Sequence, residues 1–392
     1  MNDSKQAIGL MSGTSLDGVD AVAITTAPLQ TIAHASLPMP ARLKEWLTEL
    51  CTPLAPGQAP ATDPIDLLGL ARRDLTDLYA EAVAALPAAI RAQASVIGAH
   101  GQTIRHRPEQ SFSLQILDGA RLAEATGLPV VTDFRSADLA AGGQGAPLAP
   151  LFHQIMPATA SAASAVVNVG GIANVTVLAP ADTAGGTRRL LAGFDTGPGN
   201  RLLDDWCQLH RGQPFDANGQ WAASGKADSA LLTHLLADPF FGLPAPKSTG
   251  REDFSLSWLQ DKLRSFAAGQ QAPAPADVQA TLVELTAASI IAAVADYRPA
   301  GLVICGGGAA NPVLMQALNA QFNTRLHADR QSAEPPPCVS SSRIGIDPQQ
   351  VEAAAFGWLA QQRLQGLALD LSAATGASAP RILGAMYLPP PR

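Results

Sequence analysis

Three glycine-containing turns, each directly after a short apolar segment, constrain the fold of this chain more than any other feature. They lie at Ser12–Gly18, Gly170–Asn174 and Gly306–Asn311. The first two lead back into alternating β-branched residues, which predicts a β-hairpin at each. Taken singly, each turn is either a place where glycine supplies positive φ or a loop whose backbone N–H groups bind phosphate. Three such turns in this order favour phosphate binding, although none matches the P-loop or the dinucleotide fingerprint.

Around these turns, apolar residues repeat with a period of two in some segments and of about 3.6 in others, which predicts strands and helices respectively. Asp63 is the predicted N-cap of one helix, and Gly212 the predicted end of another. The alternation of the two periods predicts an α/β fold. The predicted strands are residues 7–11, 19–24, 96–100, 129–133, 165–169, 174–178, 190–195 and 301–305, and the predicted helices are 64–85, 201–210, 275–297 and one that starts at Asp347.

The length of 392 residues suggests two domains, and a Gly-, Pro- and Ala-rich stretch at 145–160 predicts domains 1–150 and 151–392. Only 15% of the residues are charged, and the net charge is −7 without a Lys/Arg cluster, which argues against nucleic acid or an anionic membrane as a partner. The densest apolar run, Ala287–Ala295, is too short to cross a bilayer. The N-terminus lacks the pattern of a secretory signal, and the four cysteines lack metal-ligand or disulfide spacing. We therefore expect a soluble cytoplasmic protein.

Three aspartates are candidates for chemistry. Asp195 ends an apolar strand beside the Gly-rich segment 196–200, where a carboxylate can act as a general base. An Asx turn or a helix N-cap explains the same position equally well. Asp17 and Asp20, in and after the first turn, are candidate magnesium ligands through oxygen or water.

Ten further polar residues lie in apolar surroundings: His100, Gln102, Thr103, Asp133, Arg135, Lys247, Ser248, Thr249, Arg251 and Glu352. Arg135 can clamp a substrate carboxylate in bidentate fashion, or it forms a surface ion pair. His100, which precedes Gln102 and Thr103, is either a catalytic residue or a hydrogen-bonded histidine near a loop. Glu352, at the edge of an apolar helix face, is either a functional carboxylate or a first-turn residue favoured by the helix dipole.

Seven short segments stand out as motifs: Gly9–Asp20, His100–Thr103, Asp133–Arg135, Asn168–Asn174, Gly193–Asn200, Pro246–Glu252 and Cys305–Asn311. They resemble the motifs of the anhydro-N-acetylmuramic acid kinases, a family of the actin, hexokinase and heat-shock chaperone ATPase superfamily. The matching segments run in family order from residue 9 to about 356, so the resemblance covers essentially the whole chain. Leu16 stands where that family often has Met, which is a mild apolar change.

The resemblance implies an α/β fold of two ribonuclease H-like lobes with a central nucleotide cleft that takes ATP and Mg²⁺. It also implies a reaction in which 1,6-anhydro-N-acetylmuramic acid, ATP and water give N-acetylmuramic acid 6-phosphate and ADP. Cell-wall recycling, a cytoplasmic location and a homodimer follow from the same resemblance.

The resemblance also implies roles for individual residues. Asp195 is the implied catalytic base, and Asp17 and Asp20 are the implied metal ligands. The implied substrate contacts are Arg135, His100, Gln102, Thr103 and Glu352. The implied ATP contacts are Gly13, Thr14, Ser15, Leu16, Asp17, Gly18, Val19, Asp20, Gly170, Gly171, Asn174, Gly306, Gly307, Gly308 and Asn311.

Three other functions compete with this one. An ordinary sugar kinase would deprotonate a free hydroxyl group and would consume no water. A chaperone-like ATPase would need a peptide-binding appendage. A glycosidase with two carboxylates would need no nucleotide loops.

Overall fold

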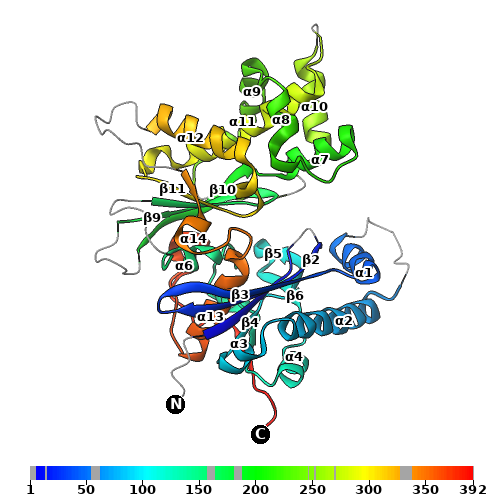
Figure 1. Cartoon of the computed structure of the whole chain (residues 1–392), viewed down its shortest axis with the longest axis vertical. Helices are drawn as coiled ribbons and strands as arrows, with labels where there is room; N and C mark the ends of the chain where they lie inside the picture. Colours follow the sequence, from blue (N-terminus) through cyan, green and yellow to red (C-terminus); the bar gives the residue numbers. More distant parts are fainter. Residues whose placement is uncertain are drawn as a thin grey trace. The chain divides into compact units, whose positions relative to one another are not determined.

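The computed structural model describes residues 6–13, 16–53, 62–156, 164–180, 188–245, 247–250, 253–268, 271–326 and 338–391. The chain forms two compact α/β units (Figure 1). The first contains Met1–Phe152 and Gln350–Arg392, and the second contains His153–Gln349.

The first unit is built on a six-stranded sheet of order β13-β7-β4-β1-β2-β3. Strands β1, β2 and β3 form an antiparallel meander, and β4 and β7 continue the sheet parallel to β1. The predicted hairpin is present, with Met11 opposite Asp20. The strands are β1 (Gln6–Met11), β2 (Gly18–Thr26), β3 (Leu29–Pro38), β4 (Ile97–Ala99), β7 (Val130–Thr132) and β13 (Ala385–Tyr387), and a separate two-stranded sheet contains β5 (Gln102–Arg107) and β6 (Phe112–Ile116).

Three helices of the first unit, Pro64–Ala84, Gly119–Thr126 and Val351–Leu364, pack on this sheet. The predicted N-cap is confirmed, because the Asp63 carboxylate accepts a hydrogen bond from the N–H of Ile65 at 2.8 Å. The helices are α1 (Ala41–Cys51), α2 (Pro64–Ala84), α3 (Ala88–Gln93), α4 (Gly119–Thr126), α5 (Ser136–Ala140), α6 (Ala149–His153, at the boundary of the units), α13 (Val351–Leu364) and α14 (Ser372–Thr375), with one 3-10 turn, η1 (Pro108–Gln110).

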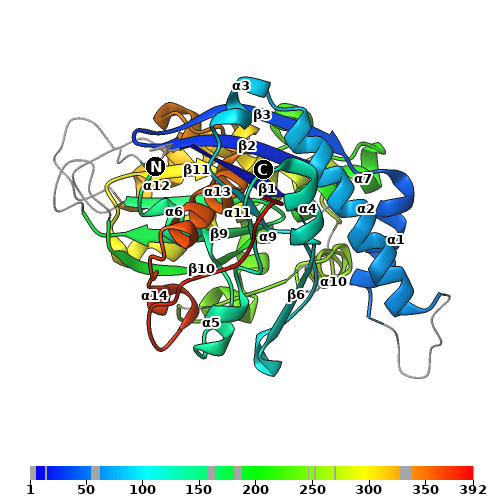
Figure 2. The same ribbon diagram turned by 90° about the horizontal axis from the view of Figure 1, so that it is seen from below.

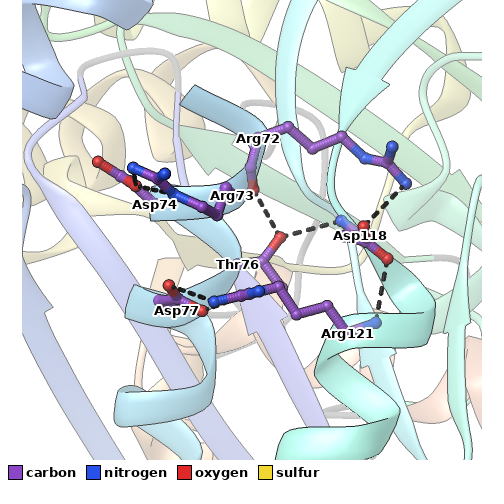
Figure 3. A network of polar contacts seen from close by, with 7 residues as sticks. All are labelled: Arg72, Arg73, Asp74, Thr76, Asp77, Asp118 and Arg121. Carbon is purple, nitrogen blue, oxygen red and sulfur yellow. Dashed lines mark hydrogen bonds and ion pairs between the residues drawn. The ribbon is translucent and has the colours of Figure 1, made fainter. Parts of the chain in front are cut away.

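Helices α2 and α4 lie side by side (Figure 1, Figure 2), and a polar network joins them (Figure 3). The buried Thr76 hydroxyl donates to the carbonyl of Arg72 at 2.7 Å and accepts from the N–H of Asp118 at 2.9 Å. Around it, Arg121 forms a bidentate pair with Asp77. Exposed ion pairs of this kind contribute little to stability. The two hydrogen bonds of buried Thr76 are therefore the polar contacts that define how α2 packs on α4.

Helix α13 joins the first unit through backbone contacts that only glycine permits. A Cβ on Gly9 of β1 would lie 1.7 Å from the carbonyl oxygen of Ala353, and one on Gly98 of β4 would lie 1.9 Å from that of Phe356. The predicted second domain, 151–392, is therefore wrong for its last part. The segment that starts at Gln350 packs on the first sheet, a long-range contact that no local pattern reveals.

The predicted start of helix α13 at Asp347 is also wrong. The Asp347 carboxylate accepts a hydrogen bond from the N–H of Gln349 at 2.9 Å, and the helix begins at Val351. The aspartate therefore forms a local turn in place of a helix cap.

The second unit repeats the strand arrangement of the first. Its sheet has the order β10-β9-β8-β11-β12, with β8, β9 and β10 antiparallel and β11 and β12 parallel to β8. The predicted α/β class and the ribonuclease H-like topology of both units are confirmed. The strands are β8 (Ser164–Val169), β9 (Ile172–Leu178), β10 (Leu190–Pro198), β11 (Leu302–Cys305) and β12 (Cys338–Ser340).

One face of the second sheet packs on helices, chiefly α11 with α7, α9 and α12 (Figure 1). Gly212 ends α7 in the left-handed conformation at φ 65°, as predicted. The helices are α7 (Arg201–Arg211), α8 (Gln220–Ser224), α9 (Ser229–Leu236), α10 (Leu256–Phe266), α11 (Pro275–Val294) and α12 (Pro312–Leu326), with 3-10 turns η2 (Ala217–Gly219), η3 (Pro239–Gly242), η4 (Ala295–Tyr297), η5 (Gly307–Ala310) and η6 (Ser341–Ile344).

Among the residues that the structure describes, one helix, Pro275–Tyr297, is long and apolar enough to cross a membrane by length and composition. The short run Ala287–Ala295 therefore understated the length of this apolar segment. Within the protein, 78% of its most apolar window is buried, and Leu282, Leu285 and Ile290 belong to the core of the second unit. Burial on most sides accounts for its apolar character.

We expect Gly98→Ala to destabilise the first unit by about 2 kcal/mol or more, because the added methyl group would overlap a backbone carbonyl. Gly69→Ala is the matched control: Gly69 is exposed within α2 with no other atom near its Cβ position. This control should raise stability by roughly 0.5–1 kcal/mol. Urea unfolding of the two variants measures both effects, and equal midpoints would contradict the proposed contact.

Candidate active site

The turn after β1 is anchored by a buried hydrogen-bonded chain. The Tyr79 hydroxyl donates to Ser12 Oγ at 2.9 Å, and Ser12 Oγ donates to Gln102 Oε1 at 2.8 Å. All three side chains are at most 2% exposed, and burial raises the pKa of Tyr79, which keeps its hydroxyl protonated. The Ser12 hydroxyl thus makes its hydrogen bonds within the first unit, and these bonds fix the first residue of the turn.

The other predicted ATP contacts of the first turn have different environments. Gly13 is half-buried, whereas Thr14 and Ser15 lie outside the described residues. Leu16 has a positive φ of 57°, an uncommon conformation for leucine, and Val19 points into the core. A Cβ on Gly18 would lie 2.4 Å from the carbonyl of Leu37, so packing against β3 already requires glycine at position 18.

The two predicted magnesium ligands are both accessible carboxylates. Asp17 is 75% exposed and pairs with Lys44 at 3.2 Å, and Asp20 is 40% exposed and lies 3.3 Å from His34 Nε2. In the described part of the chain, no three His, Cys, Asp or Glu side chains group as metal ligands. Mg²⁺ binds through one or two carboxylates and several waters, so Asp20 fits such a site, and Asp17 fits it less well because it already faces a cation.

His100 and Arg135 meet in the first unit. His100 Nδ1 lies 2.8 Å from the carbonyl of Gly101, and its Nε2 lies 2.8 Å from a guanidinium nitrogen of Arg135. Because arginine only donates, His100 accepts at Nε2 and donates at Nδ1. Burial, together with the charge of Arg135, lowers the pKa of His100 well below its usual value. His100 is therefore a neutral residue that orients Arg135.

Arg135 is held at several points and faces two carboxylates. Its guanidinium also donates to the carbonyl of Gly145 at 2.7 Å. Burial lowers the pKa of Arg135 to about 10, and the charges of Glu352 and Asp138 oppose that shift. The structure thus brings His100, Arg135 and Glu352 into one neighbourhood, with the Phe356 ring against His100 at 4.7 Å between ring centroids.

Gln102 and Thr103 use their side chains inside the first unit. Gln102 is 1% exposed and accepts the Ser12 hydrogen bond, and Thr103 Oγ1 accepts from Gln115 at 3.1 Å. Gln102 is thus part of the support for the first turn.

In the second unit, three polar residues form a row across neighbouring strands. Asn168 of β8 is opposite Asn174 of β9, which is opposite Asp195 of β10. Residues directly opposite share a face of the sheet, so the three side chains point the same way. A register shift follows Asp195, and such irregularities often re-aim a side chain beside an active site. No local sequence pattern gives Asn168 a role in the site, because only the strand register reveals the row.

The Asp195 carboxylate is held by one short segment. Its Oδ2 accepts from the N–H of Thr249 at 3.0 Å and from Ser248 Oγ at 3.2 Å, and its own N–H donates to the carbonyl of Lys247 at 3.0 Å. Burial raises the pKa of Asp195, and the two donors oppose that effect. A fixed carboxylate with a raised pKa has the properties of a general base.

The second and third glycine turns meet through Asn200. Its N–H donates to the carbonyl of Gly170 at 2.8 Å, and its side chain donates to the carbonyl of Val169 at 3.1 Å. The same amide lies 3.4 Å from the Cβ position of Gly307. Asn200 therefore links the two turns, a role that the sequence analysis did not give it.

Packing accounts for two of the three consecutive glycines of the third turn. Gly306 has φ 77°, and a Cβ on Gly308 would lie 2.4 Å from Val169 Cγ1. Gly307 has the most room. Asn311 accepts from the N–H groups of Val313 and Leu314, so its side chain caps helix α12.

Comparison with known proteins gives one consistent result. A family model described as anhydro-N-acetylmuramic acid kinase matches residues 5–389. An anhydro-N-acetylmuramic acid kinase of Bordetella avium is 47% identical over 390 residues, covering 98% of this chain and 97% of that protein. A protein of the same name from Xanthomonas oryzae pv. oryzae is 46% identical over 397 residues, covering 98% of each chain.

Proposed function

Because this chain belongs to the anhydro-N-acetylmuramic acid kinase family, we propose that it opens the 1,6-anhydro ring of anhydro-N-acetylmuramic acid and phosphorylates O6 with ATP. The products are N-acetylmuramic acid 6-phosphate and ADP, and the reaction belongs to cell-wall recycling. The observation that carries the proposal is the Asp195 carboxylate, fixed by Ser248 and Thr249, with its pKa raised by burial.

Asp195 serves as the general base for a water molecule. The water oxygen bonds to C1 of the sugar, its proton passes to Asp195, and the C1–O6 bond breaks. O6 then carries negative charge and attacks the γ-phosphorus, so that ADP leaves. The proton on Asp195 returns to solvent. The anhydro sugar has no free 6-hydroxyl, so a single base serves both the hydrolytic and the phosphoryl-transfer steps.

The three glycine turns bind ATP. Backbone N–H groups of such turns bind phosphate, and the anchored Ser12 and the bridging Asn200 support the geometry of the turns. Asp20, with Asp17, holds Mg²⁺, which when bound neutralises charge on the phosphoryl oxygens. The nucleotide contacts are Gly13, Thr14, Ser15, Leu16, Asp17, Gly18, Val19, Asp20, Gly170, Gly171, Asn174, Gly306, Gly307, Gly308 and Asn311. Val19 and Asn311 contribute backbone groups only, because the Val19 side chain lies in the core and the Asn311 side chain caps α12.

Arg135 binds the lactyl carboxylate of the sugar, and Glu352 provides a second substrate contact. His100 supports this role, since its neutral ring accepts from Arg135 and leaves the positive charge for the ligand. Gln102 and Thr103 support the site indirectly. Gln102 hydrogen-bonds to Ser12, and Thr103 hydrogen-bonds to Gln115.

The hydrolytic step distinguishes this function from that of an ordinary sugar kinase. In ¹⁸O-labelled water, we expect label at C1 of the product, read by mass spectrometry before the free sugar exchanges its anomeric oxygen. ADP release should depend on the anhydro sugar and not on open-ring N-acetylmuramic acid. An unlabelled early product would show that no water attacks C1.

Asp195→Asn should keep ATP binding and lose turnover by about 10²–10⁴-fold, because it removes the base and changes little else. Titration calorimetry with ATP and a steady-state assay measure the two effects. Asp296→Asn is the control, an exposed aspartate in the turn η4, and it should behave like the wild type. Near-normal turnover of Asp195→Asn would refute the assignment.

The protein works as a homodimer in the cytoplasm, as the family resemblance implies. Sedimentation velocity at micromolar concentration should give one species of twice the chain mass. A single monomer peak across that range would contradict the dimer.

A further inference from the structure

The segment that holds Asp195 is itself attached to a second element. Lys247 Nζ donates to the carbonyl oxygens of Phe240 at 3.0 Å and Phe241 at 3.3 Å, both in the turn η3. The same ammonium lies 4.5 Å from the centre of the Phe240 ring. The Lys247 side chain therefore spans from the segment 247–249 to η3. There, both carbonyl oxygens and the face of the Phe240 ring stabilise its positive charge.

The turn η3 is a firm anchor. Asp238 accepts from the N–H of Phe240 at 3.1 Å, from Trp258 Nε1 at 2.9 Å and from Lys262 at 3.0 Å. Aromatic rings pack around the turn, with Phe240 against Phe254 at 5.3 Å and Phe254 against Trp258 at 5.1 Å between centroids. Charge-assisted bonds and ring packing together fix the two carbonyls that Lys247 binds.

The same turn also contacts the chain on the other side of Asp195. A Cβ on Gly197 would lie 2.8 Å from Phe241 Cε1, so the Phe241 ring packs directly on the end of β10. The turn η3 thus touches the end of β10, two residues after Asp195, and, through Lys247, the segment that hydrogen-bonds its carboxylate.

We propose that Lys247 is a positioning residue for Asp195, which holds Ser248 Oγ and the N–H of Thr249 against the carboxylate by tying their segment to η3. The inference rests on the proposed role of Asp195 as the base. Lys247 touches neither the reacting atoms nor the Asp195 carboxylate, and its effect passes through two hydrogen bonds. Without them, burial raises the pKa of Asp195 further, and the carboxylate loses its fixed direction.

Besides Asp195, a second carboxylate among the described residues contacts this segment. Asp253 accepts from Thr249 Oγ1 at 2.8 Å and from the N–H of Gly250 at 3.2 Å. Lys247 and Asp253 thus hold opposite ends of the segment, and Asp238 and Lys262 are the charged groups on the η3 side. If Asp253 alone were sufficient, removal of the Lys247 ammonium would leave Asp195 unchanged.

The test compares Lys247→Met with Lys247→Arg and with Ser248→Ala, which removes one donor to Asp195 directly. Lys247→Met should lower kcat roughly 10–100-fold while ATP affinity stays within about twofold, because the base is misplaced and the nucleotide turns are untouched. The acid limb of the kcat/KM profile should move to higher pH, in the same direction as for Ser248→Ala. Lys247→Arg should recover part of both losses, since a guanidinium also donates to carbonyls.

Lys226→Met, at an exposed lysine of the same unit, is the matched control and should be unchanged. A general loss of stability also moves the acid limb to higher pH, because a destabilised protein unfolds first in acid. The folded fraction of each variant is therefore measured by circular dichroism over the same pH range, and only the limb of the folded protein is compared. An acid limb of Lys247→Met that coincides with the wild-type limb overturns the inference. Should Lys247→Met fail to fold in a thermal melt, Lys247→Gln replaces it under the same criterion.

Asp195→Asn in the same assays distinguishes an error in the role of Asp195 from an error in the role of Lys247. Full activity of Asp195→Asn would overturn both the role of Asp195 as the base and this inference. Loss of turnover in Asp195→Asn, with an unmoved acid limb in Lys247→Met, would overturn the role of Lys247 alone.

Discussion

Direct contact between the backbones of two strands and one helix is the constraint on which the first unit depends. Gly9 and Gly98 let β1 and β4 approach α13 until carbonyl oxygens fill the space of missing side chains. The close approach also has a functional result. Helix α13 carries Phe356, which packs on His100, and Glu352, whose charge acts on Arg135. The packing of a helix on a sheet thereby sets the environment of the predicted substrate contacts.

The two units use one strand arrangement for different tasks. In both, a β-hairpin opens the sheet and parallel strands extend it, so the predicted ligand turns follow corresponding strands. In the first unit, Tyr79 and Gln102 anchor the hairpin turn through Ser12. In the second, Asn200 ties the hairpin turn to the third glycine turn. Each turn is thus supported by a polar residue from outside it.

The sequence predicts part of the local elements, because hairpins and amphipathic helices have local signatures, but it does not predict β3 or helices such as α1, α10 and α12. The Asp63 cap, the Gly212 stop and the first two hairpins all follow from neighbouring residues. The return of residues 350–392 to the first sheet does not, because it depends on glycines more than 250 residues away. The buried state of Gln102 and the row from Asn168 to Asp195 also depend on partners and strand register that no single segment shows.

The division of the chain has a consequence for the order in which it folds. The second unit is one continuous stretch, His153–Gln349, inserted between the two parts of the first. During synthesis, the second unit is complete while the glycine-lined faces of β1 and β4 still lack the helix that covers them. The N-terminal sheet therefore emerges first from the ribosome but is finished last, the reverse of the usual sequence for a chain of two domains.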